Sequence, residues 1–226
     1  MNTPHPDHSR NNHILIMAAV EAECEAIRRG IPAEAASRIT VKAAGVGPAA
    51  AAVATTLSLT GQTYNLVISA GIGGGFAPHA SIGSIVLADQ IIAADLGSET
   101  AEQGFISVDE LGFGQSVLTS DAAYNATLAT ALTSSGLSVH IGSALTVSTT
   151  TGSAASTAAL LQRIPNAACE GMEGFSVAMA AQAFQLPVLE LRAISNAVGP
   201  RDRDSWNIPA ALQSLTQASR ILAEVL

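Results

Sequence analysis

The densest cluster of charge in the sequence follows an apolar segment. The run at 188–194 has the composition of a buried strand, and it ends in Ser195 and Asn196. Four charged residues follow shortly after, in the order Arg-Asp-Arg-Asp at 201–204. An amide at the end of a strand can both donate and accept hydrogen bonds. These residue types at this spacing mark the segment as a candidate binding site for a polar ligand.

Arg192 lies inside this apolar run, where a charged side chain is unexpected. An unpaired charge in a protein interior is very costly, so Arg192 must meet a carboxylate or a ligand. Glu23 and Glu173 are the available partners if the strands that precede them lie next to this one.

Three acids, Glu21, Glu23 and Glu25, follow the first apolar run. Acids at the start of a helix are stabilised by the helix dipole, which accounts for one or two of them. Acids spaced two apart cannot all lie on one face of a helix. A partly desolvated acid after a buried strand could instead have a raised pKa and serve as a general base. Both interpretations remain open from spacing alone.

Glu170, Met172 and Glu173 precede a second, very apolar helical segment. Acids at a helix start again provide one interpretation. Glu173 is unusual, however, because the helix that it precedes offers no surface lysine as a partner.

The segment AGIGGGF at 70–76 invites comparison with the dinucleotide-binding pattern G-x-G-x-x-G. Phe76 stands where the third glycine would be, so no dinucleotide cofactor is expected. Gly73 and Gly74 fit better at a turn where the backbone approaches a sugar or phosphate closely.

The order of elements predicts an α/β fold. Short apolar runs predict strands, and periodic segments after Gly or Pro predict helices. Strands are expected at 13–19, 38–47, 64–71, 138–148 and 187–195, with extended structure at 81–96. Helices are expected at 20–30, 48–59, 121–135, 154–163, 172–184 and 208–225. The prediction is a single α/β domain over 13–226, with a central mixed, twisted sheet flanked by helices, after a disordered tail at 1–12.

Composition excludes several function classes. The 226 residues carry a net charge of −8, which argues against a nucleic-acid or anionic-membrane surface. Segment 43–88 has no charged residue, but Pro, Gly and polar residues interrupt it, so no membrane span is expected. Only 12% of residues are charged, against about 25% in typical domains. Either Ser, Thr and Gln keep the surface soluble, or part of it is covered in a homo-oligomer, a dimer or higher, which is the expectation here. Cys24 and Cys169 are expected to be reduced, inert thiols of a cytoplasmic protein without a metal site.

Taken together, the motifs resemble the purine nucleoside phosphorylase and nucleosidase superfamily. The resemblance runs from about residue 13 to the C-terminus and implies a three-layer fold and a nucleoside as the small-molecule partner. It is carried by SAGIGGGFAP, IGSIVLADQ, GMEGFSVA and RAISNAVGPRDRDSW. The last motif is the most specific, and it resembles the futalosine hydrolases, which belong to the futalosine route to menaquinone.

The resemblance implies roles for the matching positions. Glu23 would activate water, Met172 and Glu173 would hold the ribose, and Arg192 would steady the acidic cluster. Asn196 stands where the related methylthioadenosine/adenosylhomocysteine nucleosidases have Asp. A 6-oxopurine presents two acceptors, O6 and N7, to which an amide can donate and a carboxylate cannot. Asn196 therefore predicts hypoxanthine as the leaving base.

Further positions complete the expected site. Asp202 could pass a proton to the base through water, although ordinary surface ion pairs would also explain the charges at 201–204. Ser195, Gly73 and Gly74 are expected to contact substrate, and Phe76 and segment 149–153 are expected to form walls of the base pocket. Trp206 is expected to anchor the closing helix.

Two rival functions remain. A phosphorylase of the same fold would need more cationic groups for phosphate, and Glu23 would repel that anion. A nucleoside-binding module without turnover would keep Asn196 and Met172 but would not need Glu23.

Overall fold

The computed structural model describes residues 13–102 and 104–226, so the predicted tail at 1–12 lies outside the described residues. The strands are β1 (Ile14–Ala18), β2 (Ile39–Ala43), β3 (Leu66–Gly75), β4 (Ile85–Ala93), β5 (Gly97–Glu99), β6 (Phe105–Ser107), β7 (Val117–Thr119), β8 (Val139–Thr146), β9 (Ala167–Gly171) and β10 (Val188–Ala197). The α-helices are α1 (Glu21–Gly30), α2 (Pro48–Gly61), α3 (Ala122–Ser134), α4 (Ala154–Arg163), α5 (Gly174–Ala183) and α6 (Ile208–Val225).

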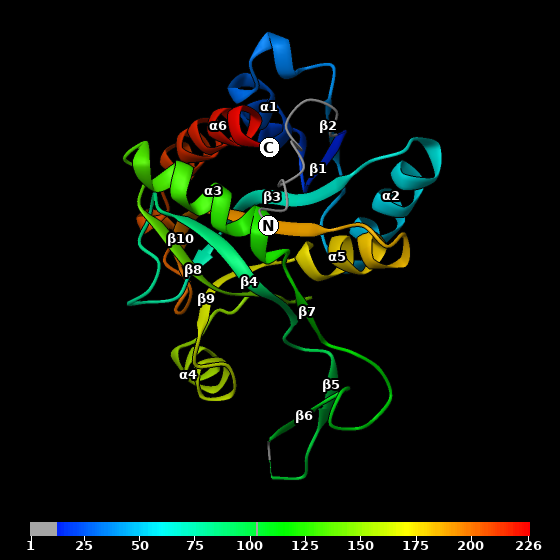
Figure 1. The fold of residues 1–226 in the computed structure, drawn as a ribbon. Coiled ribbons are helices and arrows are strands. Elements are labelled where there is room, and N and C mark those ends of the chain that lie inside the picture. Colours follow the sequence, from blue (N-terminus) through cyan, green and yellow to red (C-terminus); the bar gives the residue numbers. More distant parts are fainter. Residues whose placement is uncertain (1–12, 103) are drawn as a thin grey trace, which may run out of the picture.

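The main sheet is mixed and partly closed. Its strand order is β10-β4-β8-β9-β3-β1-β2, and β10 also pairs with β3 in parallel. Five strands therefore pair in a closed ring, in the order β3-β10-β4-β8-β9 and back to β3. The strands β1 and β2 extend outward from β3. The small β5-β6 pair projects away from the body of the molecule (Figure 1). The predicted mixed α/β sheet with flanking helices is confirmed.

The central strands are mostly apolar because both faces of the main sheet are covered. In β1, Ile14 and Ile16 face one hydrophobic core, whereas Leu15 and Met17 face the other. The first core contains side chains from α1, α3 and α6, and the second contains side chains from α2 and α5 (Figure 1). Side chains alternate between the faces of a strand, so a continuous apolar run is what two covered faces require.

Several elements differ from the prediction. The strand β9 was not expected, because AACEG is short and rich in small residues. The helix expected from 172 begins at Gly174. The strand β3 runs four residues further than predicted, to Gly75, and β10 runs two residues further, to Ala197. The short strands β5, β6 and β7 were not expected either.

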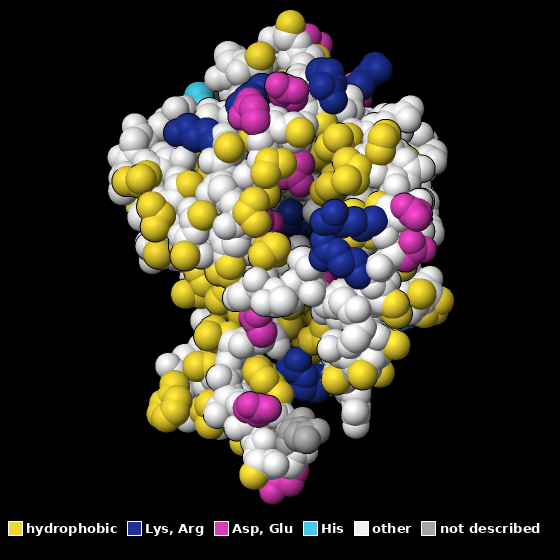
Figure 2. Space-filling view, turned by 180° about the vertical axis from the view of Figure 1, so that it is seen from behind, with side chains coloured by type: hydrophobic (Ala, Val, Ile, Leu, Met, Phe, Trp, Pro, Cys, Tyr) yellow, Lys and Arg dark blue, Asp and Glu magenta, His cyan; other side chains and the backbone are white. Residues whose placement is uncertain are grey.

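The surface carries few charges. Figure 2 shows one face on which hydrophobic and uncharged polar side chains predominate and charged side chains are scattered, with a hollow near its middle. In the ranges 13–102 and 104–226, no helix has both the length and the apolar character needed to cross a bilayer.

Candidate functional site

A cavity of about 260 Å³ lies near the carboxyl ends of β1, β3, β9 and β10. Ligands of open α/β sheets bind at such strand ends. Predicted site residues line much of it, namely Glu23, Gly73, Gly74, Met172, Glu173, Ser195 and Asn196. Thr150 and Thr151, from the segment expected as a wall, line it as well.

Glu23 is the one acid of the first helix that turns inward. It is 4% exposed, whereas Glu21 and Glu25 lie on the surface. One carboxylate oxygen, Oε1, accepts the Ile72 N–H at 2.8 Å, and Oε2 accepts the Val20 N–H at 3.1 Å. Glu23 therefore serves the helix start and also presents a fixed carboxylate to the cavity.

Arg192 lies beneath the cavity with its side chain fully buried. Its Nε donates to Glu190 Oε1 at 2.8 Å, and its Nη2 donates to Ser69 Oγ at 2.9 Å. Its Nη1 lies 3.7 Å from Glu173 Oε2. Burial alone would lower the pKa of Arg192, but the carboxylates of Glu190, Glu173 and Glu23 outweigh it and raise that pKa above its usual range. The predicted partners Glu23 and Glu173 do surround it, and Glu190 is a third that sequence reasoning missed.

For Glu190, in contrast, the effect of burial on the pKa is larger than that of the neighbouring charge. Burial raises its pKa above the ordinary range, and the neighbouring Arg192 guanidinium opposes that rise. Its Oε2 has no hydrogen-bond partner among the described residues. The carboxyl groups of Glu23, Glu173 and Glu190 all lie near the guanidinium of Arg192. One positive charge cannot balance a full negative charge on each of them.

Glu173 is the N-cap residue of α5, but its side chain forms no capping hydrogen bond with that helix. Its Oε1 accepts the Gly47 N–H at 3.1 Å, and its Oε2 accepts the Met172 N–H at 3.2 Å. The side chain is thus held by the loop after β2 and by Arg192 rather than by the helix. The structure places it next to Met172 on the cavity wall.

A β-bulge sets the direction of Asn196. The register of β10 against β3 runs Ile194 to Gly73 and then Asn196 to Gly74, so Ser195 is the extra residue. Asn196 Nδ2 donates to the Ala197 carbonyl at 3.0 Å, and its Oδ1 accepts from Ser195 Oγ at 2.8 Å. One amide N–H is left for a ligand in the cavity.

Neighbouring atoms approach Gly71 and Gly74 so closely that neither position has room for a side chain. A Cβ on Gly71 would lie 2.6 Å from Glu23 Oε1 and 2.8 Å from Arg192 Nη1. A Cβ on Gly74 would lie 2.8 Å from Val198 Cγ2 and 3.3 Å from Asn196 Nδ2. The glycine-rich end of β3 therefore lets the polar groups and a ligand come together, as expected from its sequence.

Two predicted residues lie elsewhere. Phe76 is fully buried in a hydrophobic cluster with Ile92 and Leu145, beneath α4, and does not line the cavity. Asp202 is exposed, and its Oδ1 accepts the Asp204 N–H at 3.2 Å, at the start of a short 3₁₀ turn. Neither placement matches the expected role in the pocket.

Other residues join the site without having been predicted. Trp206 lines the cavity instead of only anchoring α6, and the Arg201 guanidinium lies 5.4 Å from the centre of its ring. Glu170 lines it too, from the unexpected strand β9. The signal for Glu170 was an acid in an otherwise apolar segment next to Met172.

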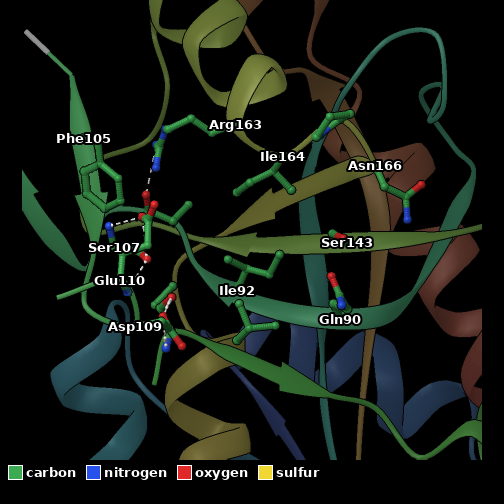
Figure 3. Close-up of a pocket in the computed structure, with 15 residues that line it drawn as sticks. Gln90, Ile92, Phe105, Ser107, Asp109, Glu110, Ser143, Arg163, Ile164 and Asn166 are labelled. Atoms are coloured by element: carbon green, nitrogen blue, oxygen red, sulfur yellow. Dashed lines mark hydrogen bonds between the residues drawn. The ribbon is translucent and has the colours of Figure 1, made fainter. Parts of the chain in front are cut away.

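A larger cavity of about 650 Å³ lies beside β4 and β6 (Figure 3). None of the predicted site residues line it. Several of its polar side chains are engaged with neighbouring groups: Ser107 Oγ donates to Glu110 Oε2 at 2.9 Å, and the Arg163 guanidinium lies 4.1 Å from the centre of the Phe105 ring. The smaller cavity, where carboxylates and an amide converge, is the candidate active site.

Both cysteines are buried and free. Burial, followed by the nearby Glu21 carboxylate, raises the pKa of Cys24 to about 11, and burial raises the pKa of Cys169 further still. In the described part of the chain, no group of three or more His, Cys, Asp or Glu side chains is arranged to hold a metal ion.

Comparison with known proteins gives concordant results. Futalosine hydrolase of Streptomyces coelicolor is 49% identical over 95% of this chain and 96% of its own length, and that of Acidothermus cellulolyticus is 42% identical over 90% and 87%. The crystal structure of futalosine hydrolase of Helicobacter pylori superposes with a TM-score of 0.82 at 17% identity, covering 94% of this chain and 97% of that one, and shows the shared fold. Residues 18–226 match the family model of the Phosphorylase superfamily. The chain belongs to that superfamily.

Proposed function

We propose that this protein is an N-glycosyl hydrolase that cleaves futalosine to hypoxanthine and dehypoxanthine futalosine, a step of the futalosine route to menaquinone. Two relatives that are 49% and 42% identical over nearly the whole chain bear the name futalosine hydrolase. The observation that carries the proposal is the buried Glu23 carboxylate on the wall of a cavity that also has an amide, rather than an acid, at position 196.

Glu23 activates the nucleophile. Two main-chain N–H groups hold its carboxylate in one orientation, and each oxygen keeps a lone pair for a water molecule. The water oxygen attacks C1′ as the bond from C1′ to the purine nitrogen breaks, and Glu23 takes the water proton. The base leaves with the bonding electron pair and gains a proton from solvent, and Glu23 later returns its own proton to solvent.

Glu173 and Met172 hold the ribose. The Glu173 carboxylate lies beside Arg192, and its oxygens can accept hydrogen bonds from the ribose hydroxyls. A fixed negative charge close to C1′ also stabilises the oxocarbenium-like transition state. Met172 supplies an apolar contact for the sugar from the same wall.

Asn196 recognises the base. The Nδ2 hydrogen that is not used by the Ala197 carbonyl can be donated to O6 of a 6-oxopurine, and Oδ1 can accept from a protonated N7. Mismatched hydrogen bonds in a closed site cost about 10⁴- to 10⁵-fold in discrimination. Adenine has an amino group at C6, which is a donor in the place where hypoxanthine has the acceptor O6.

Hydrolysis fits the cavity better than phosphorolysis. Among the residues that line it, Arg201 is the one basic side chain, and it lies over Trp206. Arg192 is buried and engaged with carboxylates. A phosphate ion would meet the carboxylates of Glu23 and Glu173, with Arg201 as the single cation on the cavity wall to offset their charge.

The test is product release from futalosine. The purified protein is incubated with futalosine with and without phosphate, and hypoxanthine is measured by chromatography. We expect equal release in both samples. Release only with phosphate would show a phosphorylase, and no release from folded protein would show a binding module.

A further inference from the structure

One row of the sheet places two polar side chains on either side of a glycine. Gly74 of β3 is the register partner of Asn196 on β10 and of Glu170 on β9. Register partners on neighbouring strands direct their side chains to the same face of a sheet. Glu170 and Asn196 therefore flank an open position, since Gly74 has no side chain to fill it.

The spacing of this row suits a flat ring. Adjacent strands lie about 4.8 Å apart, so the backbones of Glu170 and Asn196 are about 10 Å apart across Gly74. Both side chains line the cavity, as does Gly74. A planar base above Gly74 would have an amide at one edge and a carboxyl group at another.

Glu170 is buried and keeps hydrogen-bond acceptor positions that a ligand could use. It is 5% exposed and has no ion-pair partner among the described residues. The Thr151 N–H donates to Oε1 at 2.8 Å, and the Thr151 hydroxyl donates to Oε2. Burial raises its pKa above the usual range, and these two bonds oppose the rise. A carboxylate accepts about four hydrogen bonds, so two acceptor positions remain.

We propose that Glu170 is a specificity-determining residue that accepts a hydrogen bond from the N1–H of a 6-oxopurine. The inference rests on the proposed function and adds a second contact to the base. In hypoxanthine, N1 carries a hydrogen next to O6. In adenine, N1 is an acceptor, which an ionised carboxylate repels. Asn196 and Glu170 together thus match the order of acceptor and donor groups along one edge of hypoxanthine.

The substitution Glu170→Gln reverses this pattern. A glutamine can accept the Thr151 N–H with Oε1, and its Nε2 can donate to the Thr151 hydroxyl. The remaining Nε2 hydrogen then faces N1, where it meets the N–H of hypoxanthine unfavourably and the lone pair of adenine favourably.

The experiment uses calorimetry to measure how tightly the protein binds hypoxanthine and 1-methylhypoxanthine. In the second ligand, a methyl group replaces the N1 hydrogen. The unmodified protein should bind hypoxanthine about 100-fold more tightly. Glu170→Gln should lose that preference, and so should Glu170→Ala, which removes the acceptor without adding a donor. Glu25→Gln, on the exposed face of α1, is the matched control and should keep it.

A second readout separates recognition from stability. The ratio of kcat/KM for futalosine to that for its 6-amino analogue should fall about 100-fold in Glu170→Gln. A merely structural role would lower both values together and leave the ratio unchanged.

The outcomes distinguish this inference from the proposed function. Equal binding of the two ligands by the unmodified protein, or an unchanged preference in Glu170→Gln, would overturn the role of Glu170 even if futalosine is hydrolysed. Absence of futalosine hydrolysis would overturn the proposed function, while the binding data would still decide whether Glu170 reads N1. If Glu170→Gln fails to fold, the unmodified protein and Glu170→Ala decide the question.

Discussion

Arg192 brings together side chains from three distant parts of the chain. Its guanidinium contacts Glu190 and Ser69 and lies near Glu173. The charge of Glu23 also helps to raise the pKa of Arg192. Removing one member of such a buried cluster leaves another charge uncompensated, so these residues depend on one another. The result is that the acids facing the cavity are held in fixed positions before any ligand arrives.

The substitution Glu23→Gln tests water activation. Gln can still accept one main-chain N–H, so the fold should persist, but its amide cannot take a proton from water. We expect kcat for futalosine to fall about 100- to 10,000-fold, which is the usual contribution of a general base. Initial rates and thermal unfolding are measured side by side. Turnover close to that of the unmodified protein would rule out the role of Glu23.

The substitution Asn196→Asp tests base recognition at O6 and N7. A carboxylate repels both acceptors of a 6-oxopurine but can accept from the amino group of adenine. The preference for futalosine over its 6-amino analogue should fall at least about 100-fold. The measurement is kcat/KM for each substrate. If the preference is unchanged, Asn196 does not contact the base.

At the scale of elements, the site depends on how three strands end. The bulge in β10 turns Asn196 instead of Ser195 toward the face shared with Gly74. The strand β9 brings Glu170 to the other side of Gly74. Bulges re-aim side chains in this way next to functional sites in many sheets.

The contact between α1 and α6 offers a test of packing behind the site. A Cβ on Gly30 would overlap the Thr216 carbonyl oxygen and lie 2.9 Å from Ser219 Cβ. Gly30→Ala should therefore force the helices apart and lower the free energy of unfolding by about 1–3 kcal/mol. Urea unfolding measures this change.

The matched control is Gly61→Ala at the end of α2. A Cβ there would meet no atom within 4 Å. Alanine also has the higher helix propensity, so stability should stay the same or rise slightly. Equal destabilisation by both substitutions would contradict the packing explanation.

At the scale of the whole molecule, the charge-poor surface includes an apolar stripe on α2. Val53 and Leu57 are 61% and 67% exposed and lie one helical turn apart. Exposed apolar groups in contiguous patches are typical of protein–protein interfaces. The sequence-based prediction of a homo-oligomer therefore has a candidate contact surface.

The double substitution Val53→Glu and Leu57→Glu tests this surface. We expect the unmodified protein to sediment as a dimer or larger, and the variant to sediment at a lower mass, because two buried carboxylates would oppose association. Gln213→Glu and Gln217→Glu, at exposed positions one turn apart on α6, form the control with the same number of added carboxylates. A monomeric unmodified protein would contradict the prediction.

Much of this molecule could be predicted from local sequence. Apolar runs predicted the central strands because both faces of the sheet are covered, and Gly30, Pro48 and Asp121 marked where helices end or begin. An arginine in an apolar run predicted a partner, either a carboxylate or a ligand, since an unpaired buried charge is very costly. The structure supplies carboxylates. The mixed α/β fold, inferred from the order of strands and helices, and the superfamily, inferred from motifs, are both confirmed.

The tertiary structure alone decided which residues share the cavity. Glu170 and Asn196 come together because both pair with Gly74, and that register depends on a bulge and on a short strand without a local signal. Phe76, which packs beneath α4, and Trp206, which lines the cavity, also differ from expectation. Local composition determines whether a segment is a strand or a helix, whereas the direction of a side chain at the strand's end depends on long-range pairing, and a shift of one residue reverses it.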